Sequence, residues 1–233
     1  MFKYLIALLL LIPSAHAKFA HESEASTVVN RGNSNLESYL LKTSNKYQWS
    51  ENITSLLGQY TYGETNDIPN VDSWNLSIRY ERKLNDRLGI FLAEEVESNR
   101  FAGYKRRYNT DLGGKYRFIQ NENNTTSFEL GYRYTVENPT NEGTRKENKG
   151  RLAVETEHKF NENYKVRFGT EYIPNFTYSQ GFLVNTQASL TAVLNRYFSL
   201  KTSYQRNYDN KPLPGNSKYD SRYTTALVAS FQI

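Results

Sequence analysis

Five short segments containing asparagine recur along this chain at nearly even intervals. They centre on Asn52, Asn85, Asn123, Asn161 and Asn195, so successive segments lie 33 to 38 residues apart. Between them lie stretches in which apolar and polar residues alternate. Asparagine favours tight turns between such stretches, and a fixed repeat indicates one structural unit used many times. The spacing predicts a series of β-hairpins closed into an antiparallel up-and-down β-barrel, with these five turns at one end.

A period of two residues defines the predicted strands. In one of them Trp74, Leu76 and Ile78 alternate with Asn75 and Ser77, which gives a strand with two chemically different faces. The alternation is less regular in the first, third and fifth strands, whose registers it does not determine. It predicts an all-β fold of about 12 strands, over residues 19–30, 35–48, 53–64, 72–83, 87–98, 104–118, 125–138, 149–160, 164–175, 180–194, 197–208 and 219–233.

The chain begins with an export signal. Lys3 supplies a positive charge, Leu5–Ile12 is an unbroken apolar run, and residues 15–17 form a small-x-small cleavage site. This pattern is typical of a secretory signal peptide and is too short to span a bilayer. We therefore expect a signal peptide over residues 1–17 and one barrel domain over residues 18–233. The chain has no cysteine, which excludes a disulfide framework and a lipid-anchored lipoprotein.

The polar composition is compatible with a membrane barrel. Mean hydropathy is −0.73, but strands of a membrane barrel expose only every second residue to lipid. The net charge of +5 is too small to indicate nucleic-acid binding. Longer connections at 66–72, 138–149 and 209–218 alternate with the Asn turns, just as longer extracellular loops alternate with short periplasmic turns in even-stranded outer-membrane barrels. We therefore expect the protein in the bacterial outer membrane.

Aromatic residues favour the same location. The chain has 19 tyrosines, many of them near predicted strand ends, where amphipathic rings form the interfacial girdles of membrane barrels. The last strand alternates from Tyr223 to the end of the chain and is similar to the terminal strand recognised by the barrel assembly machinery, although its final residue is Ile233 rather than an aromatic. The expected partners are outer-membrane lipid, lipopolysaccharide, the assembly machinery during biogenesis, and a small charged solute.

The predicted inner face carries charges of both signs. The candidate lumen-lining residues are Arg79, Glu81, Arg107, Asp111, Lys115, Arg117, Glu129, Arg133, Arg151, Glu155, Glu157, Arg167 and Glu171. The alternation places further charged residues on the same face, namely Lys42, Lys46, Glu95, Glu97, Glu137, Lys159, Lys165, Lys201 and Arg222. A wall of one sign would select ions of the opposite sign, whereas interspersed signs favour ion pairs and a narrow lumen. An open pore stays an alternative, since a barrel of this size can hold water.

A family resemblance extends over most of the chain. The segment 72–118, which contains the run Arg79-Tyr80-Glu81-Arg82-Lys83-Leu84, and the earlier turn 29–34 around Gly32 resemble the YdiY-like family of salt-induced outer-membrane proteins. This resemblance implies an outer-membrane barrel linked to salt or osmotic stress, and it supplies no catalytic residues. In size and strand number the chain is also similar to the KdgM-like oligogalacturonate porins, which implies acidic sugars passing a basic lumen. The mixed inner charge departs from that pattern.

An enzyme is not predicted. The chain after residue 17 has two histidines, His21 and His158, and no serine stands at a lipase-like spacing from His158. No P-loop, EF-hand or zinc spacing is present, so we expect neither a metal nor a cofactor. The leading hypothesis is a non-enzymatic barrel that acts as a narrow channel or a structural envelope component. The alternatives are a substrate-specific porin for charged oligosaccharides or small anions, and an outer-membrane hydrolase.

Overall fold

The structure is a computed structural model that describes residues 17–30, 35–140, 143–178, 180–212 and 217–233. The predicted signal peptide lies outside the described residues, except for Ala17. The strands are β1 (Lys18–Asn30), β2 (Leu36–Trp49), β3 (Asn52–Thr65), β4 (Ile68–Lys83), β5 (Leu88–Asn99), β6 (Tyr104–Gln120), β7 (Asn124–Pro139), β8 (Arg145–Lys159), β9 (Tyr164–Pro174), β10 (Phe182–Val193), β11 (Phe198–Asp209) and β12 (Tyr219–Gln232).

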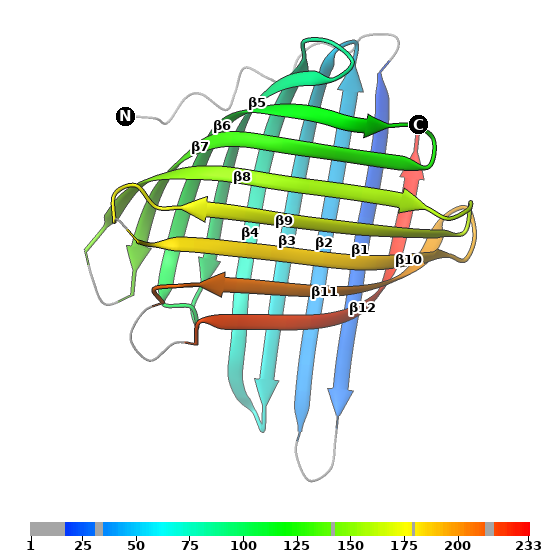
Figure 1. The fold of residues 1–233 in the computed structure, drawn as a ribbon. Coiled ribbons are helices and arrows are strands. Elements are labelled where there is room, and N and C mark those ends of the chain that lie inside the picture. Colours follow the sequence, from blue (N-terminus) through cyan, green and yellow to red (C-terminus); the bar gives the residue numbers. More distant parts are fainter. Residues whose placement is uncertain (1–16, 31–34, 141–142, 179, 213–216) are drawn as a thin grey trace.

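These strands close into one barrel. Each strand pairs antiparallel with its neighbours in the chain, and β1 pairs with β12. This confirms the predicted twelve-stranded up-and-down barrel. In Figure 1 the strands β1 to β4 cross behind β7 to β12 at a steep angle, as the strand tilt of a closed barrel requires. The closing pair is short, because it joins only Ala20–Ala25 to Leu227–Gln232.

The five Asn turns lie at one end of the barrel, which we call the Asn-turn rim. In four of them the asparagine side chain stabilises the turn. Asn85, Asn121, Asn161 and Asn195 each accept, through Oδ1, hydrogen bonds from the backbone N–H groups two and three residues later, at 2.7–3.1 Å. These are Asx turns, in which the side chain replaces a backbone acceptor.

The turn between β2 and β3 is built differently from the other four. It has Ser50 in the left-handed region with φ of 48°. The described strand ends Lys18 and Gln232 meet at the same rim, where Phe19 and Ile233 exchange two backbone hydrogen bonds.

Two predicted loops are shorter in the structure. The connection expected at 138–149 is reduced to residues 140–144, because β7 ends at Pro139 and β8 begins at Arg145. The sequence predicts another long connection at 66–72, but β3 and β4 are joined by the two residues Asn66 and Asp67. Both have positive φ, 51° and 63°, which Asn and Asp tolerate better than other side chains. A β-bulge at Gly63/Glu64 adjusts the register beside this turn. A polar sequence with Asn and Asp therefore marked a tight hairpin rather than a loop.

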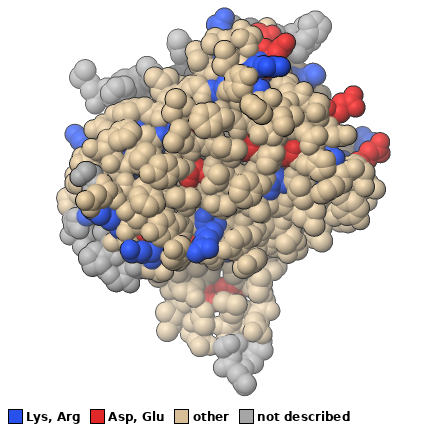
Figure 2. Space-filling view, in the orientation of Figure 1, with Lys and Arg blue, Asp and Glu red and all other residues tan. Residues whose placement is uncertain are grey.

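The two faces of the barrel differ in chemistry. Apolar side chains of the alternating pattern point outward, and Leu76, Leu130 and Leu227 are 47%, 58% and 50% exposed. Figure 2 shows one side of this outer surface, which is mostly uncharged. Charged side chains such as Asp111 and Glu129 point inward and are buried. No helix long and apolar enough to cross a membrane occurs among the described residues.

Candidate functional site

A network of ion pairs occupies the middle of the barrel. Glu129 on β7 accepts two hydrogen bonds from Arg79 on β4, at 3.0 and 2.8 Å, and one from Arg151 on β8, at 2.7 Å. Arg133 donates two hydrogen bonds to Asp111, at 2.6 and 2.7 Å. Ion pairs join nine residues into what we call the central network, namely Arg79, Glu81, Asp111, Lys115, Arg117, Glu129, Arg133, Arg151 and Glu171.

The network spans the interior because its strands are not all neighbours. Two strands separate β4 from β7, so the Arg79–Glu129 pair crosses the inside of the barrel rather than running along its wall. The side chains of Arg79 and Glu129 are 24% and 10% exposed. Paired charges of this kind satisfy one another where water is scarce. The network therefore crosses the interior from β4 to β9.

A phenylalanine that the sequence did not indicate anchors this network. Phe91 points inward from β5, is 2% exposed, and lies beneath the guanidinium of Arg79 at 3.8 Å from the ring centroid, with Arg151 at 5.6 Å. Its ring fits a slot left by Gly113 and Gly131, where a Cβ on Gly113 would come within 2.6 Å of the ring. Strand β5 has apolar residues on both faces, so the alternation could not indicate that Phe91 faces inward. The paired glycines opposite were the available sign.

The remaining predicted residues form two other groups. Arg107 pairs with Glu97 at 3.2 Å and Glu137 at 2.6 Å, and its guanidinium stacks on Tyr104. Nearer the Asn-turn rim, Arg167 pairs with Glu157 at 2.7 Å and with Glu155 at 3.4 Å. Arg167 and Glu155 are about half exposed, so water reaches this part of the interior.

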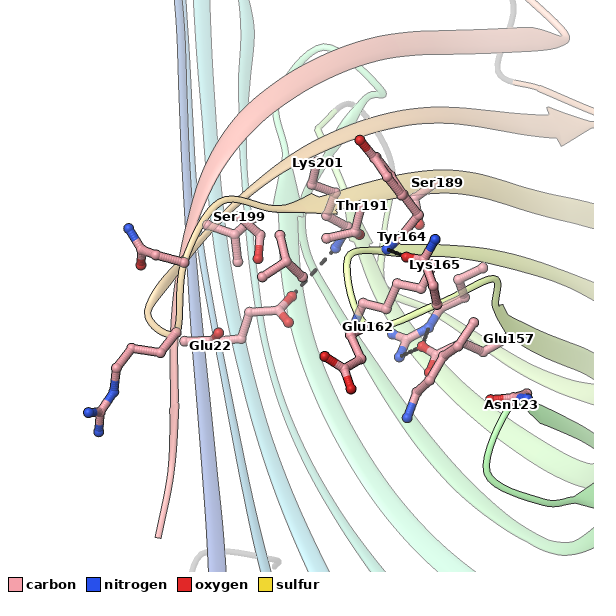
Figure 3. Close-up of a pocket in the computed structure, with 18 residues that line it drawn as sticks. Glu22, Asn123, Glu157, Glu162, Tyr164, Lys165, Ser189, Thr191, Ser199 and Lys201 are labelled. Atoms are coloured by element: carbon pink, nitrogen blue, oxygen red, sulfur yellow. Dashed lines mark hydrogen bonds and ion pairs between the residues drawn. The ribbon is translucent and has the colours of Figure 1, made fainter.

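A cavity of about 660 Å³ opens at the Asn-turn rim. Its lining comes from β8 to β12, from β1, from the turns between β8 and β11, and from Asn123 before β7, and Figure 3 shows several of these side chains around one space. Lys159 and Lys165 are direct cross-strand partners, and Thr191 and Lys201 continue the same row across β10 and β11. The hydroxyls of Ser189 and Ser199 line the same cavity.

A further ion-paired cluster links strands from the two halves of the chain. Lys201 on β11 donates a hydrogen bond to Glu24 on β1 at 2.7 Å, and Lys42 on β2 lies 3.2 Å from the same carboxylate oxygen. Glu24 and Lys201 are each 8% exposed. Because β12 lies between β1 and β11, this ion pair bridges the closing strand pair. In the part of the chain that the structure describes, no group of three or more potential metal ligands occurs.

Comparison with known proteins gives a family. A family model described as "Protein of unknown function, DUF481" matches residues 23–231. The chain belongs to this family. Its description names no activity, and no curated protein sequence matches the chain.

Solved structures share the architecture. The COG4313 outer membrane channel from Pseudomonas putida F1 has a TM-score of 0.56 and 11% identity, covering 95% of this chain and 97% of that one. The NanC porin has a TM-score of 0.52 and 10% identity, covering 91% and 97%. The KdgM porin is a more distant match, with a TM-score of 0.47 and 11% identity, covering 92% and 97%. The fold thus matches outer-membrane porins and channels, and identities this low show the fold alone.

Proposed function

We propose that this protein is a barrel of the bacterial outer membrane that acts as a narrow channel or as a structural component of the envelope. The apolar outer face and the even number of strands support this location. The Asn-turn rim, where β1 begins and β12 ends, would face the periplasm. Outer-membrane lipid, lipopolysaccharide and the barrel assembly machinery are the partners that such a barrel requires.

The observation that carries the proposal is the central network. It crosses the interior, its side chains are 7–24% exposed, and its signs are mixed. Because the network lies across one side of the lumen, ions have only a restricted path along the other side. Paired charges of both signs give weak selection between cations and anions. The network presents ion pairs rather than a nucleophile beside a base, so we assign the barrel interior no catalytic role.

Conductance in planar lipid bilayers tests this function. The wild-type protein should show small, discrete current steps with weak ion selectivity. A variant carrying Arg79→Ala and Arg151→Ala should conduct more, because both guanidinium groups leave the middle of the interior. Arg106→Ala removes an exposed arginine from β6 and should leave the current unchanged. A correctly folded, heat-modifiable barrel that is silent in all three forms would refute the channel and leave the structural role.

A porin specific for small anions is the second candidate, and the rim cavity favours it. Like charges directly opposite each other destabilise a strand pair, yet Lys159 faces Lys165 there. An anionic solute would relieve that repulsion, and nearby hydroxyls would hydrogen-bond to it. Inorganic phosphate should then reduce the current in wild-type protein and lose this effect in Lys159→Gln/Lys165→Gln. Lys83→Gln, at the same rim but outside the cavity lining, is the control, and equal loss there would contradict a specific site.

A link to salt or osmotic stress is proposed on the sequence resemblance to the YdiY-like family. It predicts that the transcript rises when sodium chloride is added to the medium. A transcript level that is the same at low and high salt would contradict it.

A further inference from the structure

Three polar side chains on the outer face of the barrel form a hydrogen-bonded chain. Ser23 Oγ lies 2.9 Å from His21 Nε2, and His21 Nδ1 lies 2.8 Å from Asn45 Oδ1. The Asn45 oxygen is an acceptor, so Nδ1 carries the imidazole proton and Nε2 is free to accept one from the serine hydroxyl. A nucleophile, a base and a group that orients the base, each within hydrogen-bond reach of the next, is the arrangement of nucleophilic catalysis.

The strand geometry explains how these residues meet. His21 and Ser23 are two positions apart on β1 and therefore share a face, while Glu22 and Glu24 between and beside them point inward to Lys201. Asn45 is the direct cross-strand partner of His21 on β2. On the other side, Phe231 of β12 stacks on the imidazole with centroids 4.8 Å apart. The histidine is thus held by a hydrogen bond and by an aromatic ring.

The serine of this group lines an apolar groove. A groove of about 570 Å³ on the barrel wall is bordered by Ser23 and by the exposed side chains of Leu41, Tyr60, Trp74 and Leu227. Gly58, which has no side chain, lies among them and is the cross-strand partner of Thr43. An extended apolar chain is the ligand that such a lining favours.

The position along the strand also fits a lipid ester. Next to His21 toward the Asn-turn rim lie the aromatic pairs Phe19–Phe231 and Tyr47–Trp49, with ring centroids 5.8 and 5.1 Å apart. Aromatic rings gather at the level where the apolar core of a bilayer meets its polar head groups. In the proposed membrane location, Ser23 would stand just inside that level, where the ester bonds of lipids lie.

We propose that Ser23, His21 and Asn45 form a hydrolytic site on the outer face of the barrel that cleaves carboxylic esters of long-chain fatty acids. Ser23 Oγ attacks the ester carbonyl while its proton moves to His21 Nε2. The bond from the carbonyl carbon to the alcohol oxygen breaks, and His21 gives its proton to the leaving alcohol. Water, deprotonated by His21, then attacks the acyl-serine, releasing the fatty acid and returning the proton to Ser23.

Two further residues have supporting roles. Asn45 is a positioning residue, because it holds the imidazole in the tautomer that accepts the serine proton. Thr43, directly opposite Ser23 in the register, offers a hydroxyl on the same face as a donor to the oxyanion that forms during the attack. This site goes beyond the proposed channel and does not depend on conduction. Fatty-acid release from this site would overturn the expectation that the protein is not an enzyme.

Fatty-acid release tests the site. Purified, heat-modifiable protein is incubated with p-nitrophenyl palmitate in detergent and with vesicles of phosphatidylethanolamine and phosphatidylglycerol. Wild-type protein should release fatty acid, and Ser23→Ala and His21→Ala should each lose at least about a thousandfold in rate. Asn45→Ala should lose less and change the pH profile of the rate, and Asn45→Asp should restore much of the rate because a carboxylate also accepts a hydrogen bond from Nδ1–H.

His158→Ala is the matched control. His158 Nδ1 is also hydrogen-bonded to an asparagine, Asn124, at 2.6 Å, and its ring also contacts a phenylalanine, but the residue two positions before it is Thr156, which is hydrogen-bonded to Thr126. Removing His158 should leave the rate unchanged.

Covalent labelling provides a test that needs no folded variant. Hexadecanesulfonyl fluoride should modify Ser23 of the wild-type protein, as identified by mass spectrometry of the peptide, and an excess of substrate should protect it. Labelling at Ser23 together with fatty-acid release that depends on Ser23 and His21 supports the site. Absence of either from the folded protein, or full activity in Ser23→Ala, overturns it, whatever the bilayer current shows.

Discussion

Replacing Glu129 with glutamine tests whether the central network is buried or solvated. The substitution keeps the size of the side chain but removes one negative charge from between Arg79, Arg151 and Lys115, which lie 2.7–3.3 Å from its oxygens. Arg79 keeps Glu81 at 3.4 Å and Arg151 keeps Glu171. For Lys115, Glu129 is the ion-pair partner among the described residues, so this ammonium group loses its counter-charge.

The expected loss in the free energy of unfolding follows from the burial of the Glu129 side chain. The Glu129 side chain is 10% exposed, and removing one partner of a buried ion pair costs about 3–5 kcal/mol. Glu155→Gln is the matched control, because Glu155 is 53% exposed and pairs at 3.4 Å with an Arg167 that is 51% exposed. A solvent-exposed pair contributes about 0–1 kcal/mol. The loss in the free energy of unfolding should therefore be several kcal/mol larger for Glu129→Gln than for Glu155→Gln.

Equilibrium unfolding in urea, with the barrel in detergent or lipid vesicles, measures this difference. Trp49 and Trp74 report unfolding by fluorescence, and loss of heat-modifiable migration reports it independently. With an unchanged slope, the shift in midpoint gives the change in the free energy of unfolding. Equal midpoints for Glu129→Gln and Glu155→Gln would refute the reasoning, because they would mean that water screens the central network as it screens the rim.

Three further substitutions test separate features. Gly113→Ala should destabilise the barrel by about 1–3 kcal/mol, as overpacking does, because the added carbon would lie 2.6 Å from Leu130 O. The control is Gly114→Ala, whose added carbon would have its nearest atom at 3.8 Å and should have little effect in the same unfolding assay. Asn161→Ala removes the acceptor of an exposed Asx turn and should cost about 0.5–1.5 kcal/mol, which Asn161→Asp should largely restore. Lys201→Met should lower the unfolding midpoint more than Lys146→Met, since only the first lysine is buried against acids; equal midpoints would contradict a structural role for Lys201.

The sequence predicted the strands well because alternation and turn residues are local signals. It could place Arg79 and Glu129 on the same face of different strands, but not in contact, since contact depends on how the strands tilt around the barrel. Phe91 escaped detection because its strand is apolar on both faces. The spacing of His21 and Ser23 was visible, but Asn45 completes their hydrogen-bonded chain only through the β1–β2 register, and alternation in β1 was too irregular to give that register.

The ion pair between Lys201 and Glu24 has a consequence for assembly. The two residues are 177 positions apart, and one whole strand lies between theirs in the finished barrel. A growing sheet of hairpins can form all the remaining strand pairs, because each of them joins two strands that are neighbours in the chain. It cannot bring Lys201 and Glu24 together until the first and last strands meet. Until then Glu24 has Lys42 beside it but lacks Lys201. Burial of this ion pair therefore stabilises the closed barrel and not the open sheet of hairpins. The moment at which Lys201 becomes protected from amine-reactive reagents would report when the barrel closes.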